Sequence, residues 1–428
     1  MVCETRLRSF GRYEVNAVFP HLPSAFYTSS DVLIRVRKAA YARQVSPDAV
    51  LAVILCRVAA SLPPGIVLTN GGTLDFVAAL VGSPGTGKSK AMKAATDLLP
   101  DIGTTFDGVP IGSGEGIATA YVGKPDDTGT NPLHNASALF YVDEGEQLLT
   151  VGRRDGSTTF ATMRSCWSGQ AFGTLNASTD RRRVVKAGTY RFALAVGFQP
   201  TYAAELLTGK DAGDPQRYLF AGVTHPDIPS VPPPFPDPLR LPLTASGTSM
   251  VVNVDADIAA GIARRRAEVA TGRTVLDVYD THRDLMTLKV AALLSFLNDD
   301  GDVTPQSWNL ANAVVDNGRN VRTHLVSLSQ SADNDRFLQG VERKLQEESM
   351  REERREGRIR LSAAGSMIRR TKRNEGRPVT KSILMTAVSG KHRNVIDIDD
   401  VIDFACEVGT EDGRLKREGD YFGFVPAA

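Results

Sequence analysis

The stretch ALVGSPGTGKSKAM, residues 79–92, joins the end of an apolar run to a glycine-rich turn and then to a segment of helical character. It contains the pattern G-x-x-x-x-G-K-[ST], with Gly82 first, Gly87 sixth, and Lys88 and Ser89 last. A phosphate loop needs this context, because it follows a strand and opens a helix. The stretch therefore predicts a nucleotide-binding α/β domain; the alternative is a plain glycine-rich turn.

The chemistry of such a loop explains its residue types. Glycines let backbone N–H groups curl around phosphates without Cβ clashes, and the following helix presents its positive end. Lys88 would reach the β- and γ-phosphates, and Ser89 would ligate Mg²⁺. We expect ATP and Mg²⁺ as cofactors. The expected nucleotide-binding residues are Gly82, Pro84, Gly85, Thr86, Gly87, Lys88, Ser89 and Lys90.

Apolar runs with loops and helical segments between them predict the rest of the sheet. The runs cover residues 74–82, 138–144, 190–198 and 217–223, with a weaker one at 104–111. Alternation of this kind predicts an α/β domain with a mostly parallel, buried sheet.

The run ALFYVDEGEQLL ends its apolar part in two acids, Asp143 and Glu144. A buried strand would bring Asp143 beside the phosphate loop to hold Mg²⁺, and Glu144 is the expected general base for the attacking water. A second acid, Glu115, follows the weaker strand at the place where RecA-like motors carry their catalytic glutamate. We favour Glu144; the alternative for Glu115 is a helix start capped by Ser113.

Two later polar residues suggest an assembly of subunits. Gln199 ends a buried strand where the γ-phosphate would be sensed, and its alternative role is a strand-end hydrogen bond. Arg217 precedes the last strand and could reach a neighbouring subunit's nucleotide as a finger. The alternative for Arg217 is a surface salt bridge.

Several segments together resemble AAA+ ATPases, and among these the hexameric replicative helicases of the MCM and viral superfamily-3 type. The resemblance is closer still to the helicase half of primase–helicase replication proteins of actinobacterial phages and plasmids. It rests on GSPGTGKSKA, GSGEGIATAY, FYVDEGEQLL, MRSCWSGQAFG, YRFALAVGFQP and GDPQRYLF, and also on SPDAVLAVILCRVAA, HRDLMTLKVAALLSFL and VTPQSWNLANAVV. Together these span roughly residues 30 to 320, about two-thirds of the chain.

The resemblance implies a P-loop NTPase with the AAA+ sheet order, followed by a helical lid. It implies an ATP-hydrolysing hexameric DNA helicase of phage, prophage or plasmid replication, with single-stranded, forked or origin DNA and a primase as partners. By match to the lid segment, Arg283 would contact the γ-phosphate; otherwise it is an ordinary solvated arginine. The alternatives are an ATP-switched initiator or helicase loader, and a packaging or defence NTPase on the same core.

A basic hairpin is the expected DNA contact. In residues 171–196, Ser178, Thr179 and Asp180 make a turn between β-prone flanks. The tip would carry Arg181, Arg182 and Arg183, with Lys186 nearby. In the helicases that the chain resembles, a hairpin before the sensor strand projects into the pore and grips phosphates, a sequence-tolerant electrostatic task. The alternative is a loop kept soluble by its charge.

Composition shifts divide the chain into five expected segments. These are an N-terminal helical segment (1–65), the NTPase core (66–224), a proline-rich connector (225–250), a helical lid (251–356) and a winged-helix-like tail (357–428). Residues 31–62 predict two helices split near Ser46-Pro47. The tail is basic between residues 358 and 393, but its predicted third helix carries several acids, so contact with DNA there would use Lys391, Arg393, Arg414, Lys416 or Arg417.

Overall composition limits the setting. The 428 residues carry a formal net charge of +1, so any nucleic-acid contact must come from local patches. No run of about 18 apolar residues is present, which predicts no membrane span. The first 15 residues lack the apolar core of a secretion signal. The four cysteines, Cys3, Cys56, Cys166 and Cys406, follow no metal spacing and fit a cytoplasmic protein.

Overall fold

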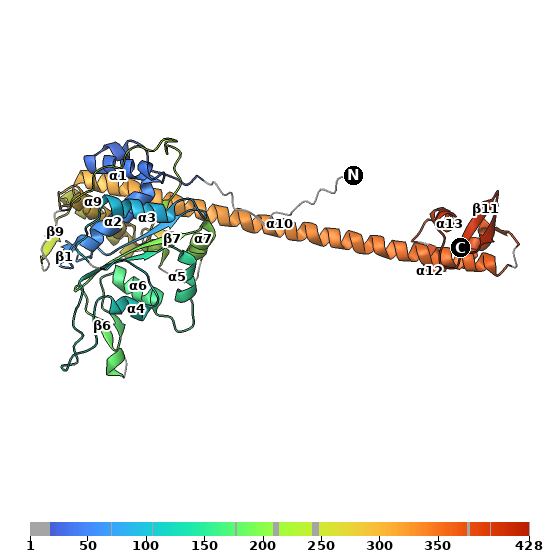
Figure 1. The fold of residues 1–428 in the computed structure, drawn as a ribbon, viewed down its shortest axis with the longest axis horizontal. Helices are drawn as coiled ribbons and strands as arrows, with labels where there is room; N and C mark the ends of the chain where they lie inside the picture. The colour runs from blue at the N-terminus through green and yellow to red at the C-terminus, as the bar shows by residue number, and fades with distance from the viewer. Residues whose placement is uncertain are drawn as a thin grey trace. The chain divides into compact units, whose positions relative to one another are not determined.

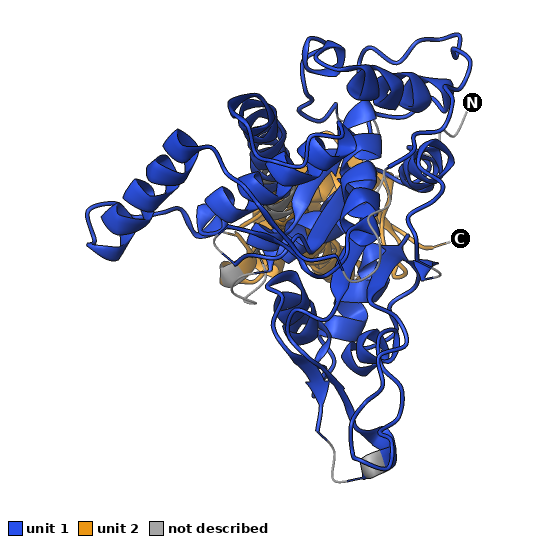
Figure 2. Ribbon diagram, turned by 90° about the vertical axis from the view of Figure 1, so that its left-hand side faces the viewer, with its two compact units in different colours: residues 1–332 blue, residues 333–428 orange. Residues whose placement is uncertain are grey.

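The computed structural model describes residues 18–69, 71–104, 106–175, 178–208, 214–241, 248–374, 377–393 and 395–427. Within these ranges the side chains of residues 179, 208, 331–339, 341 and 391 are not described. The chain divides into two compact units, residues 1–332 and 333–428, coloured separately in Figure 2. Cys56, Cys166 and Cys406 are free thiols, whereas Cys3 lies outside the described residues.

Five parallel strands form the central sheet of unit 1, in the order β3-β4-β7-β2-β8. Each predicted apolar run contains one strand, and every side chain of β2, β7 and β8 is buried. Burial on both faces is typical of a parallel sheet between helices. The predicted α/β domain with a buried parallel sheet is therefore confirmed. The bounds are β2 Phe76–Val81, β3 Asp107–Val109, β4 Ser137–Val142, β7 Arg191–Phe198 and β8 Leu219–Gly222.

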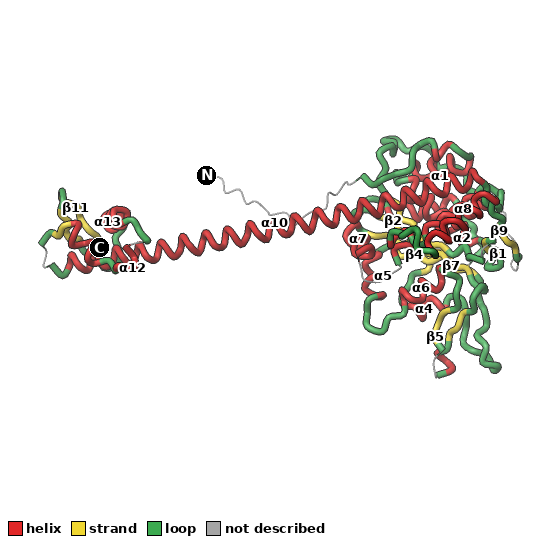
Figure 3. Tube along the Cα trace, turned by 180° about the vertical axis from the view of Figure 1, so that it is seen from behind, coloured by secondary structure: helices red, strands yellow, loops and turns green. Residues whose placement is uncertain are grey.

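Helices cover both faces of this sheet (Figures 1 and 3). On one face lie α2, Pro47–Ser61, and α3, Lys88–Leu98, and on the other lie α4 to α6. The remaining helices of the core are α4 Gly114–Thr119, α5 Gly145–Gly152, α6 Thr159–Trp167, α7 Pro200–Thr208, and the single turns η1 Phe26–Thr28 and η3 Pro215–Arg217.

The helix α2 is the centre of the core, because residues 47–60 are all buried. It packs against α3, β2, β7, β8 and α9. A helix that is apolar all round belongs inside a large core rather than on its surface. The two predicted helices are present as α1, Asp31–Ala42, and α2, split at Ser46-Pro47. Both helices pack into the same hydrophobic core as the sheet.

The proline-rich connector contains no helix or strand over its described part, residues 225–241 and 248–249. It is attached to the core, however. Arg35 donates to the carbonyls of Asp237 and Pro238, and Leu239 is buried and donates its N–H to the Leu98 carbonyl at 2.6 Å. Beyond it, β9, Met250–Val252, pairs in parallel with β1, Ile66–Leu68.

The described part of the segment predicted as a helical lid contains α8 Ala256–Ala270, α9 Arg283–Leu297 and the start of α10 Pro305–Lys372, with the single turn η4 Val278–Asp280 before α9. The helix α10 has 68 residues and runs through the predicted boundary between lid and tail at 356/357 without a break. The division between the two units lies at 332/333, inside the same helix. None of the described helices is long and apolar enough to cross a membrane.

The described part of unit 2 contains helices and short antiparallel strands. After α10 come β10 Val379–Thr380, α11 Lys381–Ala387, α12 Gly390–Arg393, α13 Ile398–Glu407, β11 Arg414–Glu418 and β12 Tyr421–Val425. The three strands pair in the order β10-β12-β11. A small core that includes Met367, Leu384, Ile402 and Phe422 joins them.

Several basic residues of unit 2 pair with acids of the same unit. The predicted acidic helix, α13, supplies several partners, so its acids neutralise bases instead of forming a separate repelling face. The pairs are Arg360–Asp400, Arg369–Asp412, Lys381–Asp399, Lys416–Glu418 and Arg417–Asp403. The Arg393 guanidinium donates to the Val388 carbonyl. Glu375 and the Lys391 side chain lie outside the described residues.

A buried carboxylate joins three parts of unit 1. Asp48 of α2 accepts from the Leu22 N–H at 3.0 Å, the Tyr27 hydroxyl at 2.7 Å and the Asn317 amide at 2.9 Å. Burial raises the pKa of Asp48 to about 6, although these bonds oppose the rise. The folded protein therefore holds this proton more tightly than the unfolded chain does, and the resulting stability is lost as pH rises through 6.

We predict that Asp48→Asn removes this pH dependence. The wild-type advantage in unfolding free energy over the variant should shrink by about 2 kcal/mol between pH 4 and pH 7. Urea unfolding of both proteins across that range measures it. Asp31→Asn, at an exposed position in the first turn of α1, is the control and should give a nearly constant difference. A constant difference for Asp48→Asn as well would contradict the prediction.

Candidate functional site at the carboxyl edge of the sheet

Three parallel strands bring the predicted site residues to one edge. The phosphate loop follows β2, the acid pair follows β4, and Gln199 follows β7, which lies between them. Val81 is paired with Phe198, and the Gly82 N–H donates to the Phe198 carbonyl at 3.1 Å. The loop therefore begins beside Gln199, as predicted for a residue that senses the terminal phosphate.

The loop has the backbone that a phosphate cradle requires. Gly85 has φ 76° and Gly87 has φ 112°, both in the left-handed region that side chains with a Cβ rarely adopt. Gly87 is also the N-cap of α3, so the first N–H groups of that helix open toward the loop. Pro84, Gly85, Ser89 and Lys90 are exposed, and Thr86 is half-buried. This cradle and its donor types fit a nucleotide phosphate chain.

Lys88 is the buried member of the loop. Its Nζ donates to the carbonyls of Gly82 at 2.9 Å and Ser83 at 3.1 Å. Burial lowers the pKa of Lys88, and the nearby charges of Glu144 and Asp143 act in the opposite direction. The structure thus brings the predicted lysine within electrostatic reach of both predicted acids.

The acid pair borders a cleft of about 560 Å³. Asp143 and Glu144 are both exposed, and Glu144 is the N-cap of α5. Ser89 lines the same cleft, together with Tyr141 and Gln147. A hydroxyl and a carboxylate that face one cleft are oxygen ligands of the kind Mg²⁺ prefers. Ser89 and Asp143 could therefore hold the ion, and Glu144 lies beside them.

A network beneath this cleft fixes its floor. The buried guanidinium of Arg57 donates to both carboxylate oxygens of Asp107, at 2.8 and 2.9 Å, and to the Tyr141 hydroxyl at 3.1 Å. Tyr141 lies two residues before Asp143 on β4. The network therefore ties α2 and β3 to the strand that carries the acids. Sequence analysis did not identify Arg57 or Tyr141, because neither belongs to a local motif.

Gly197 is a further site residue that sequence analysis missed. A Cβ at this position would lie 2.6 Å from the Asp143 carbonyl oxygen and 3.3 Å from Cδ of Lys88. Glycine is thus the only residue type that lets the lysine side chain and the acid-bearing backbone approach β7. The available signal was a single glycine inside an otherwise bulky buried strand, which indicates close backbone approach.

Glu115 has the arrangement of a helix start. Ser113 is the N-cap of α4 and accepts from the Gly116 N–H at 3.0 Å. The Thr158 hydroxyl donates to the Glu115 carboxylate at 2.9 Å. The backbone N–H of Glu115 itself, with help from Thr158 and Ser113, keeps the pKa of this carboxyl below its usual value. Glu115 does not line the cleft that contains Glu144.

Arg217 lies at the opposite edge of the sheet from its own phosphate loop. β8 begins at Leu219, which pairs with Ala78 near the start of β2. Arg217 therefore lies level with the amino end of β2, and the strand separates it from Gly82 by roughly 20 Å. Its guanidinium lies over the Trp167 ring, 5.5 Å from the centroid.

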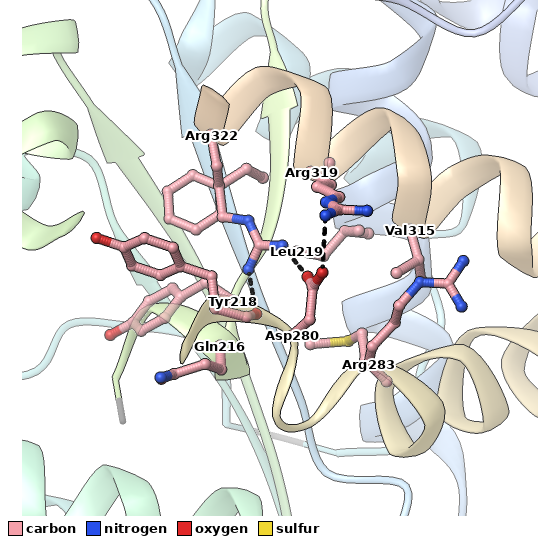
Figure 4. Close-up of a pocket in the computed structure, with 12 residues that line it drawn as sticks. Gln216, Tyr218, Leu219, Asp280, Arg283, Val315, Arg319 and Arg322 are labelled. Atoms are coloured by element: carbon pink, nitrogen blue, oxygen red, sulfur yellow. Dashed lines mark hydrogen bonds and ion pairs between the residues drawn. The ribbon is translucent and has the colours of Figure 1, made fainter. Parts of the chain in front are cut away.

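Arg283 is likewise not brought to its own phosphate loop. It lines a small cavity of about 20 Å³ with Gln216 and Tyr218, next to the start of β8 (Figure 4). Its guanidinium pairs with Asp316 at 2.8 Å and donates to the Asn312 amide oxygen at 3.2 Å. Within one chain, this placement does not support the expected contact of Arg283 with the γ-phosphate.

The predicted basic hairpin is present. β5, Phe172–Thr174, pairs antiparallel with β6, Arg183–Val185, and the turn η2, Thr179–Arg181, lies between them. Figures 1 and 3 show the pair extending from the side of the sheet that α4 and α6 cover. Residues 176–177 and 209–213 lie outside the described residues.

The three arginines of the hairpin point differently. Arg181 is exposed, whereas Arg183 folds back and donates to the carbonyls of Asp180 and Arg182. Arg182 and Lys186 line a cleft of about 420 Å³ between the hairpin and the loop at 122–133. Asn131 of that loop joins the two, donating to the Arg182 carbonyl and accepting from the Val184 N–H.

Two comparisons with known proteins identified no family and no relative of this chain. No protein-family model matches the chain, and a search of curated proteins found no significant match. What the site does must therefore be inferred from its own residues and geometry.

We predict that Gly197→Ala disrupts the site. The added Cβ would overlap the Asp143 carbonyl, so the β4 end or Lys88 must move, at a cost of about 1–3 kcal/mol. Nucleotide affinity should fall about tenfold, which corresponds to 1.4 kcal/mol. Nucleotide titration and thermal unfolding measure the two effects. Gly357→Ala, inside α10 where a Cβ would meet nothing within 4 Å, should leave nucleotide affinity unchanged and should not lower thermal stability. Wild-type affinity in Gly197→Ala would refute the role.

Proposed function

We propose that this chain hydrolyses ATP with Mg²⁺ and uses the energy, as a ring of identical subunits, to move along single-stranded DNA as a helicase. The observation that carries the proposal is the meeting of Lys88, Ser89, Asp143, Glu144 and Gln199 at one edge of a parallel sheet. The sheet order supports it, because β7 lies between the phosphate-loop strand and the acid strand, as the AAA+ resemblance implies.

Each residue at the edge has a separate task in this reaction. Lys88 would hold the β- and γ-phosphates, and Gln199 would orient the terminal phosphate. Mg²⁺ held by Ser89 and Asp143 would neutralise phosphate charge. Glu144 would accept a proton from water as the water oxygen bonds to the γ-phosphorus and the bond to the β-phosphate oxygen breaks. The products are ADP, inorganic phosphate and a proton.

The position of Arg217 supports a ring. An arginine that stabilises the transition state must reach the γ-phosphate, and this one is separated from its own loop by the length of a strand. A neighbouring copy stacked head-to-tail would offer its phosphate-loop edge to Arg217. Such heterologous contacts close into rings when the rotation between copies allows it. Six copies is the number that the resemblance implies.

The hairpin supports a nucleic-acid cargo. Arg181, Arg182 and Lys186 are cations on an extension that leaves the sheet, and they are not needed for the core to pack. Phosphate contacts by such residues are independent of base sequence, which suits a motor that must pass every base. Replication of phage, prophage or plasmid DNA, with a primase as a partner, is the setting that the resemblance suggests.

We predict that Glu144→Gln blocks hydrolysis but leaves nucleotide binding nearly unchanged. Loss of the general base should lower kcat about 10²- to 10⁴-fold. Glu115→Gln is the matched control, because it makes the same substitution in the other candidate for the general base. It should keep kcat within about threefold. Steady-state phosphate release and nucleotide titration test both variants, and the reverse ranking would assign the base to Glu115.

We predict that replacing Arg181, Arg182 and Lys186 by Ala weakens binding of single-stranded DNA while basal hydrolysis survives. The slope of log affinity against log salt should fall by about 2, since roughly 0.7 counterions are released for each phosphate contact. Fluorescence anisotropy with labelled oligothymidine at several salt concentrations measures it. The control replaces Arg351, Arg354 and Arg355, three exposed residues interleaved with glutamates on α10, and should leave the slope unchanged.

The decisive test is hydrolysis with and without single-stranded DNA, together with unwinding of a forked duplex. Stimulation and unwinding that both disappear in Glu144→Gln support the helicase. Hydrolysis without stimulation or unwinding would contradict the motor and favour the ATP-switched loader.

A further inference from the structure

The indole of Trp167 lies between two cations at the amino edge of the sheet. Trp167 ends α6 and is buried. The Nζ of Lys289, on α9, lies 3.8 Å from its ring centroid, and the guanidinium carbon of Arg217 lies 5.5 Å from it. Both distances are within the range of cation–π attraction, for which Trp is the best ring.

The orientation of this ring is not set by its own polar atom. Among the described residues, the indole Nε1 has no hydrogen-bond partner although it is buried. A buried Trp usually finds a partner for this N–H. The ring orientation is therefore determined by packing and by the contacts of the two cations with the ring, and not by a hydrogen bond of the indole N–H.

Lys289 is fixed with respect to the ring. Its Nζ donates to the Trp167 carbonyl at 2.7 Å and to the Asp75 carbonyl at 2.8 Å, and the lysine is fully buried. Burial lowers the pKa of Lys289 to about 7 against the opposing charge of Asp75, with smaller lowering effects from Arg191 and Arg217. An apolar residue would fill this space at lower cost, and a costly buried charge points to a function.

Titratable groups from several elements surround Lys289. Asp75 precedes β2 and Arg191 begins β7, with a separation of 3.9 Å between their charged atoms. His282 precedes α9, and its ring lies 5.2 Å from that of Trp167. Burial, with Arg217 and Lys289, lowers the pKa of His282 to about 4, so this ring is neutral near pH 7.

We propose that Trp167 is a positioning residue for Arg217, and that Lys289 fixes the ring so that α9 sets the direction in which the guanidinium is offered to a neighbouring copy's nucleotide. This inference rests on the proposed function, because it takes Arg217 to act between subunits. Its structural basis is separate: the Arg217 guanidinium lies over the face of the Trp167 ring, and Asp214 is among the charges that act on it.

The test compares Trp167→Leu with Trp167→Phe. Leu removes the ring face, and kcat should fall about 3- to 30-fold while the dissociation constant for nucleotide stays unchanged. Phe keeps a ring face and should recover kcat to within about threefold of wild type. The double variant Trp167→Leu/Arg217→Ala should be no slower than Arg217→Ala alone, because the ring acts through the arginine.

The outcomes separate this inference from the proposed function. If Arg217→Ala hydrolyses ATP at the wild-type rate, the role of Arg217 between subunits fails, and with it the basis of the inference. If Arg217→Ala is slow but Trp167→Leu has wild-type kcat, only the positioning role is overturned. Losses that multiply in the double variant would show a merely structural effect and would also overturn it.

A spectroscopic measurement keeps the proposal testable if Trp167→Leu does not fold. The chain has two tryptophans, so Trp308→Phe leaves Trp167 as the sole emitter. In that background Arg217→Gln should shift the emission and change its quenching by acrylamide. An unchanged emission would mean that the two side chains do not meet in solution, and the proposal would fall.

Discussion

The pairing of β7 with both β2 and β4 aligns the phosphate loop, the acid pair and Gln199 at the carboxyl edge of the sheet. Parallel strands buried on both faces lack the polar alternation that normally fixes register. Here both ends of β7 supply that information. At one end only Gly197 fits beneath the Lys88 side chain, and at the other Arg191 lies beside the buried Asp75. The Asp75 carboxylate also accepts from the Phe192 N–H at 2.6 Å. A slip of one residue would break both arrangements at once.

The buried helix α2 transmits this alignment to the acid strand. Its apolar surface packs on several strands, while its one guanidinium, that of Arg57, binds Asp107 and Tyr141. A fully buried arginine is costly unless every donor is used. Its donors also reach the carbonyls of Leu99 and Pro100 and the Thr96 hydroxyl, so most are used. The floor of the cleft is therefore set by α2, far from the acids in sequence.

Local signals in the sequence were sufficient for the strands, the phosphate loop, the acid pair and the hairpin. Each of these is encoded within about ten consecutive residues, by apolar runs, glycines or a turn. The position of α2 in the core of the sheet domain was not predicted. Apolar residues on all sides of a helix show that it is buried but not which elements bury it. The partners of Arg283 and of the bases in unit 2 depend on residues distant in sequence. Gly197 carried a local signal that became interpretable only once the neighbouring strands were known.

The two edges of the sheet have opposite chemistry. The carboxyl edge exposes Asp143 and Glu144, whereas at the amino edge Arg217 and Lys289 lie against one tryptophan, with Arg191 and the buried Asp75 next to Lys289. Cations held that closely raise one another's free energy, and the buried Asp75 offsets part of that repulsion. Under the proposed function, a triphosphate from a neighbouring copy would relieve that repulsion. Nucleotide binding in one copy would then stabilise the arginine orientation in the next, and the contact that completes the site would also be the contact that holds the ring.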